Sequence, residues 1–89
     1  MKRVEVRFTG HVQGVGFRYT TQRIATRWRV AGYVENQSDD SVLLVAEGEH
    51  KELQKFLEEI TSEMEAHINN AEIHWYAASG EWSAFSIRR

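Results

Sequence analysis

The chain has 89 residues, a hydrophobic fraction of 42%, a charged fraction of 27% and a formal net charge of −2. This size predicts one domain over residues 1–89, and the absence of cysteine excludes a disulfide framework, thiolate catalysis and cysteine metal sites. No apolar run has the character of a secretion signal or the length of a membrane span, so we expect no action at a membrane. The absence of cysteine fits a cytoplasmic protein, and the small size and mixed charge favour a monomer.

The first 36 residues predict a strand, a helix and a second strand. Apolar side chains at Val4, Val6 and Phe8 alternate with polar ones, as in a strand with one buried face. An apolar helical face over about residues 17–29 follows. The residues on that face are Phe17, Thr21, Ile24, Ala25 and Trp28. After Gly32, residues 33–36 predict a short strand.

The second half predicts a hairpin partner, a helix and further strands. The turn-forming residues 37–41 and the apolar run 42–46 complete a hairpin with the preceding strand. Apolar residues at helical spacing then predict an amphipathic helix that ends near residues 64–67. Alternation over 71–75 predicts a fourth strand, and residues 85–87 mark a short final one.

The order β-α-β-β-α-β predicts an α+β protein of ferredoxin-like architecture. Two right-handed crossovers around a central hairpin give one antiparallel sheet with two helices on one face. This fold serves many activities, so it does not by itself indicate a function.

Three glycines and an arginine stand where the first strand passes into the first helix, at Gly10, Gly14, Gly16 and Arg18. Glycine allows successive backbone N–H groups to face one ligand, and a helix N-terminus adds free donors and partial positive charge. Arginine adds a planar fork that can bind two phosphate oxygens. These residues favour an oxyanion cradle, most simply for phosphate, although a purely structural glycine turn is the alternative. The pattern fits neither a P-loop nor a dinucleotide fingerprint.

The charge is distributed unevenly along the chain. Residues 1–36 hold seven Lys/Arg and two acids, whereas residues 37–89 hold four Lys/Arg and eleven acids. The positive half contains the glycine-rich segment, which favours the approach of a small anion.

Two motifs resemble the signatures of the acylphosphatase family. The first is Gly10-x-Val12-Gln13-Gly14-Val15-x-Phe17-Arg18. The second is Gly32-Tyr33-Val34-Glu35-Asn36, at the spacing that the family uses, with Val42 and Gly48 also in the expected places. The resemblance extends over nearly the whole chain in length and order of elements.

The resemblance implies hydrolysis of a small-molecule acyl phosphate to a carboxylate and inorganic phosphate, without a cofactor or a metal. It implies that Arg18 binds the phosphate and that Asn36 orients the attacking water. The loop donors implied are the backbone N–H groups of Gln13, Gly14, Val15, Gly16 and Phe17. A chain of this length is expected to be a free-standing member rather than the related domain of the longer hydrogenase-maturation proteins.

Two positions depart from the family pattern. Asp40 stands in the hairpin turn where the family has glycine, but Asp tolerates a left-handed backbone conformation. Glu35 stands where the family more often has a basic or neutral residue. Strand alternation places Glu35 on the face opposite to Asn36, so we expect little effect on the site.

Two other functions remain as alternatives. A non-catalytic phosphate-binding or regulatory domain would keep the cradle without turnover, but Asn36 argues for a working enzyme. RNA-binding modules of the same fold stack bases on aromatic residues of the central strands, and residues 42–46 contain none. We therefore expect no nucleic-acid partner.

Overall fold

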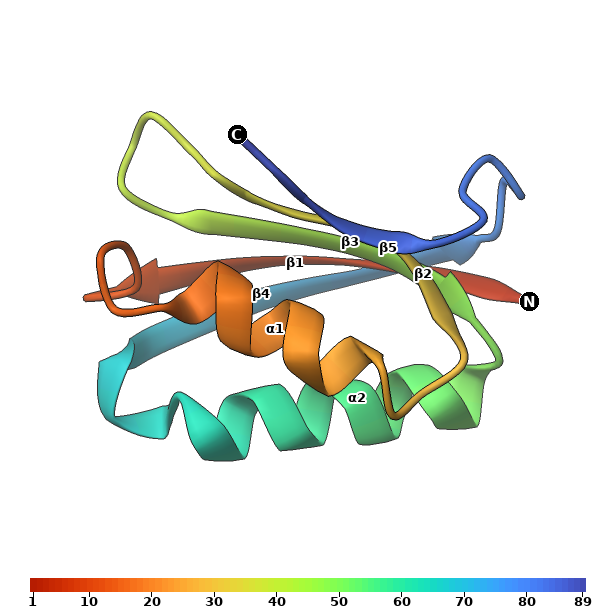
Figure 1. The fold of residues 1–89 in the computed structure, drawn as a ribbon, viewed down its shortest axis with the longest axis horizontal. Coiled ribbons are helices and arrows are strands. Elements are labelled where there is room, and N and C mark those ends of the chain that lie inside the picture. Colours follow the sequence, from red (N-terminus) through yellow and green to blue (C-terminus); the bar gives the residue numbers. More distant parts are fainter.

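The computed structural model describes residues 1–89, and two helices cover one face of a five-stranded sheet (Figure 1). In chain order the elements are β1 (Lys2–Gly10), α1 (Phe17–Ala25), β2 (Val30–Asn36), β3 (Val42–Gly48), α2 (His50–Glu63), a short 3₁₀ helix η1 (Glu65–His67), β4 (Ile68–Ala77) and β5 (Phe85–Arg88). The expected ferredoxin-like α+β sandwich is confirmed. Neither α-helix is long and apolar enough to cross a membrane.

The sheet is mixed rather than wholly antiparallel, which corrects the expectation for its last strand. Its order is β4-β1-β3-β2-β5, and β5 runs parallel to β2 while the other pairs are antiparallel. β4 ends opposite Lys2, at the end of the sheet where β2 begins. The chain crosses that end to reach the far edge, so β5 and β2 start together and run in the same direction.

The opposite end of the sheet is where β1, β2 and β5 finish. Cross-strand pairing aligns Phe8 with Val42 and Val42 with Asn36, so the last residue of β2 lies two strands away from the end of β1. Arg88, the last residue of β5, pairs with Glu35 at the same end. The loop between β1 and α1 therefore lies beside the end of β2, although more than twenty residues separate them in sequence.

The core fills the space between the sheet and the helices. Fully buried side chains come from β1, β2, β3, both helices and the β1–α1 loop. The largest are Phe8, Phe17, Phe56, Ile24, Leu44, Leu53, Ile60, Val4, Val6, Val12, Val34 and Val42. The ring centroids of Phe8 and Phe17 are 4.9 Å apart, so the two ends of the β1–α1 loop are fixed against each other.

α1 ends at Ala25, four residues before the end that the apolar spacing predicts. The N–H groups of Thr26, Arg27 and Trp28 donate to carbonyls three residues back, which is the pattern of a tightened final turn. Trp28 still packs against the core and donates its indole N–H to Glu59 at 3.0 Å. Its apolar spacing therefore reflects packing beyond the helix rather than a longer helix.

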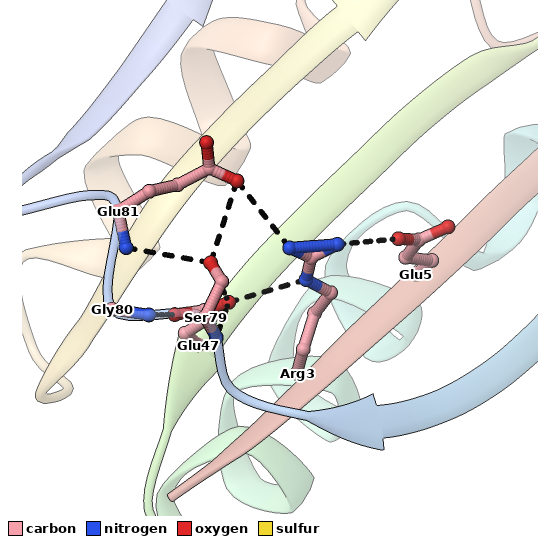
Figure 2. A network of polar contacts seen from close by, with 6 residues as sticks. All are labelled: Arg3, Glu5, Glu47, Ser79, Gly80 and Glu81. Carbon is pink, nitrogen blue, oxygen red and sulfur yellow. Dashed lines mark hydrogen bonds and ion pairs between the residues drawn. The ribbon is translucent and has the colours of Figure 1, made fainter.

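A buried carboxylate anchors the connection between β4 and β5 (Figure 2). Glu47 accepts hydrogen bonds from the Ser79 N–H at 2.7 Å, the Gly80 N–H at 2.9 Å and the Ser79 hydroxyl at 2.9 Å, and it pairs with Arg3 at 3.1 Å. Burial raises the pKa of Glu47, but these hydrogen bonds outweigh it and lower the pKa to about 2. The chain is thus held at the point where it turns toward β5.

Candidate active site

The loop from β1 to α1 presents backbone donors that the protein itself does not use. Gly14 and Gly16 have φ values of 77° and 78°, and Gly16 caps the N-terminus of α1 in the left-handed conformation. The Thr20 N–H donates to the Gly16 carbonyl at 2.9 Å and so closes the first turn. None of the loop hydrogen bonds uses an N–H group from residues 13–17. These groups are therefore available to an anion at the positive end of the helix.

Arg18 lies in the first turn of α1, directly after this loop. Its Nη1 donates to the carbonyl oxygen of Arg88 at 3.2 Å. This contact uses one of the five N–H groups of the guanidinium and leaves the others free to bind an anion. The end of β5 thus fixes the direction of the Arg18 side chain.

A cavity of about 260 Å³ lies at this end of the sheet. It is lined by Val12, Gly14, Gly16, Phe17, Arg18, Tyr19, Asn36, Ile87 and Arg89. The structure therefore brings together Arg18, Asn36 and the loop glycines, which the sequence placed in two separate motifs. The Asn36 amide takes part in none of the hydrogen bonds of the adjoining hairpin, so its donor and acceptor both remain available.

The electrostatics of the cavity favour an anion. The only charged side chains that line it are those of Arg18 and Arg89. Glu35 does not line the cavity, and its carboxylate accepts a hydrogen bond from the Gln37 amide at 3.3 Å, so its expected placement away from the site is confirmed. Asp40 has a φ of 71°, which confirms that it takes the left-handed conformation in place of glycine.

Two of the expected loop residues, Gln13 and Val15, are not among the residues that line the cavity. Val15 packs against the core, and the Gln13 amide bonds to the β2–β3 hairpin. Their N–H groups remain in the set of free donors of the loop.

The sequence did not indicate Tyr19, Ile87 or Arg89 as lining residues. Ile87 and Arg89 reach the cavity because β5 pairs with β2 and ends beside Asn36. A four-residue strand carries too little pattern to reveal its partner. Tyr19 follows Arg18 directly and is 68% exposed. Only its position in the structure identifies it as a lining residue of the cavity.

Comparison with known proteins places these features in one family. The family model described as Acylphosphatase matches residues 4–87. The acylphosphatase of Salinibacter ruber is 42% identical over 89 residues, which cover 99% of this chain and 94% of that one. The crystal structure of acylphosphatase from Bacillus subtilis superimposes with a TM-score of 0.90 at 30% identity, and each chain is fully covered.

A second kind of structure contains the same fold as a small part of a longer chain. Full-length HypF in its phosphate- and nucleotide-bound form superimposes with a TM-score of 0.83 at 26% identity. The match covers 99% of this chain but 12% of that one. The acylphosphatase of Salinibacter ruber, in contrast, is covered almost from end to end.

The fold and the cavity together define a ferredoxin-like domain with an arginine-lined cavity at the end of its sheet. The family match extends over both motifs that build this site. The chain belongs to the acylphosphatase family, and its activity is the hydrolysis of acyl phosphates.

Proposed function

We propose that Arg18 and the N–H groups of residues 13–17 bind the phosphate group, and that Asn36 orients the attacking water. The observation that carries this proposal is the shared cavity of Arg18, Asn36 and the loop glycines. The free loop donors and the two arginines can balance the charge of a bound phosphate. The Asn36 amide can accept a hydrogen bond from a water that lies between it and the phosphorus.

In the proposed reaction the water oxygen attacks the phosphorus and the bond between phosphorus and the acyl oxygen breaks. The acyl oxygen leaves as part of a carboxylate, and the water releases a proton as inorganic phosphate forms. A carboxylate is a stable leaving group, so the site needs no strong general acid. Phosphoryl transfer asks the protein mainly for positioning and for stabilisation of charge, which these groups supply.

The test is hydrolysis of benzoyl phosphate by the wild type, Arg18→Ala and Asn36→Ala, together with the Ki of inorganic phosphate. We expect Arg18→Ala to nearly abolish phosphate binding. Asn36→Ala should leave the Ki almost unchanged and lower kcat by roughly 10²-fold or more, the scale seen when a positioning group is lost.

Two matched variants serve as controls. Arg23→Ala removes another arginine of α1, one that pairs with Glu63 on the surface, and Asn70→Ala removes an exposed asparagine from the edge strand β4. Both should retain wild-type kinetics. Equal and small effects of Arg18→Ala and Asn36→Ala on KM alone would refute the division of roles. Phosphate binding without any turnover in the wild type would indicate a binding module instead.

We also propose that residues 1–89 act as one domain, as a cytoplasmic monomer without a nucleic-acid partner. A chain without cysteine suits a reducing compartment. The outer face of β1 and β3 carries charged and aliphatic side chains such as Glu5, Arg7 and Leu43, and no aromatic ring on which a base could stack. Light scattering after size exclusion tests the monomer, and a gel shift with mixed RNA oligomers tests the absence of RNA binding.

A further inference from the structure

The Gln13 side chain joins the β1–α1 loop to the β2–β3 hairpin, which carries Asn36. Its Nε2 donates to the carbonyl oxygen of Gln37 at 2.8 Å and to that of Ser41 at 2.9 Å. Both hydrogens of the amide are therefore used. Both neighbours are carbonyl acceptors, so the NH₂ group rather than the amide oxygen must face them.

These two carbonyls flank the base of the β2–β3 turn. The Ser41 carbonyl also accepts the Gln37 N–H at 2.9 Å, and the Gln37 carbonyl accepts the Asp40 N–H at 3.2 Å. Gln37 follows Asn36 directly, and Ser41 precedes Val42, the strand partner of Asn36. Gln13 thus contacts the hairpin directly after Asn36 on β2 and directly before the partner of Asn36 on β3.

Further contacts hold the hairpin side in place. Buried Ser41 donates its hydroxyl to Asp39 at 2.5 Å and its N–H to the same carboxylate oxygen at 3.1 Å. Arg7, from β1, donates to the Ser41 hydroxyl at 3.0 Å and pairs with Asp39 at 3.0 Å. The turn is therefore tied to the sheet independently of Gln13, and the contact made by Gln13 connects it to the loop.

On the loop side, the residue next to Gln13 lines the cavity. Gly14, the next residue, lines the cavity together with Gly16 and Asn36. The amide of Gln13 therefore sets the distance between the phosphate-binding backbone and the asparagine. A displacement on the order of 1 Å between positioned groups is enough to lower a rate by roughly 10²-fold.

We propose that Gln13 is a positioning residue, whose side chain keeps Asn36 in line with a phosphate bound by the loop. This inference rests on the proposed role of Asn36. The side chain of Gln13 thereby has a role distinct from the phosphate binding proposed for its backbone N–H. Because Gln13 acts through Asn36, its loss should lower turnover and leave phosphate affinity almost unchanged.

The test is a double-mutant cycle with Gln13→Met and Asn36→Ala, assayed on benzoyl phosphate with inorganic phosphate as inhibitor. Methionine keeps the length of the side chain and removes its donors. We expect Gln13→Met to lower kcat about 10-fold or more, within the range for a misplaced group, and to change the phosphate Ki less than about 2-fold. In the Asn36→Ala background the same substitution should lower kcat less than about 2-fold, since the group that it positions is absent.

Gln54→Met is the matched control, because Gln54 is exposed on α2, outside the cavity. It should behave as the wild type in both backgrounds. Should Gln13→Met melt below the assay temperature, Gln13→Asn replaces it, since its shorter amide reaches at most one of the two carbonyls.

The outcomes separate this inference from the proposed function. Full activity of Gln13→Met beside a strongly impaired Asn36→Ala would overturn the role of Gln13 alone. Additive losses in the double variant, or a Ki that rises in step with the fall in kcat, would also overturn it. Unimpaired Asn36→Ala would overturn both the role of Asn36 and that of Gln13.

Discussion

Replacing Glu47 with glutamine should remove a pH-dependent part of the stability of this protein. The carboxylate is 7% exposed and accepts hydrogen bonds from two N–H groups, a hydroxyl and Arg3. These interactions lower its pKa from 4.5 to about 2. At ~1.4 kcal/mol for each pH unit, the difference corresponds to about 3 kcal/mol of stability at neutral pH.

The direction of the pH effect follows from the lowered pKa. The folded protein binds this proton less readily than the unfolded chain, so the contribution is present above the unfolded pKa and is lost as the pH falls. The loss begins near pH 5.5, reaches about 2 kcal/mol by pH 3 and is complete below the folded pKa. Acidification should therefore release the β4–β5 connection shown in Figure 2.

Urea unfolding of the wild type and Glu47→Gln at pH 7 and pH 3 measures this contribution. We expect the variant to be about 3 kcal/mol less stable at pH 7, with the gap reduced by about 2 kcal/mol at pH 3. Glu81→Gln is the control, since Glu81 belongs to the same network but is 59% exposed, and its loss should change stability by about 0–1 kcal/mol. A gap between wild type and Glu47→Gln that is the same at both pH values would refute the reasoning.

Two further predictions concern the hairpin turn and the phosphate site. Asp40→Gly should raise the free energy of unfolding by about 0.5 kcal/mol and leave kcat unchanged, because glycine adopts the observed φ of 71° without strain. Urea unfolding checks this, and a loss of stability would show that Asp40 makes a compensating contact. Inorganic phosphate at 100 times its Kd should stabilise the wild type by about 2.7 kcal/mol. Arg18→Ala should lose this stabilisation in a thermal melt, whereas an equal rise in both proteins would place the anion elsewhere.

The acidic half of the chain contributes no acidic side chain to the lining of the cavity. Glu59 and Glu63 of α2 pair with Arg27 and Arg23 on the helical layer. These ion pairs neutralise two arginines of the basic half on the helical layer. The charged side chains that line the cavity are both arginines. A small anion thus meets positive charge in the cavity although the net charge of the protein is −2.

The sequence alone indicated the elements with strong local patterns. Alternation of Val4, Val6 and Phe8 predicted β1, and helical spacing predicted both helices. The order of the elements placed the two helices on one face of the sheet. The end of α1 was predicted too late, because Trp28 continues the apolar spacing while packing from beyond the helix. Periodicity predicts which residues are buried. It predicts the bounds of a helix only where every buried residue of the pattern belongs to that helix.

The local spacing of glycine and arginine likewise indicated Arg18 as a candidate site residue, and the resemblance to the second family motif indicated Asn36. Only the tertiary structure placed them at one cavity, through the pairing of β1 and β2 with β3. It also decided that β5 runs parallel to β2 and that the side chain of Gln13 holds the hairpin. Strand partners and side-chain contacts across long separations depend on how the whole chain packs, and no local period in a sequence records them.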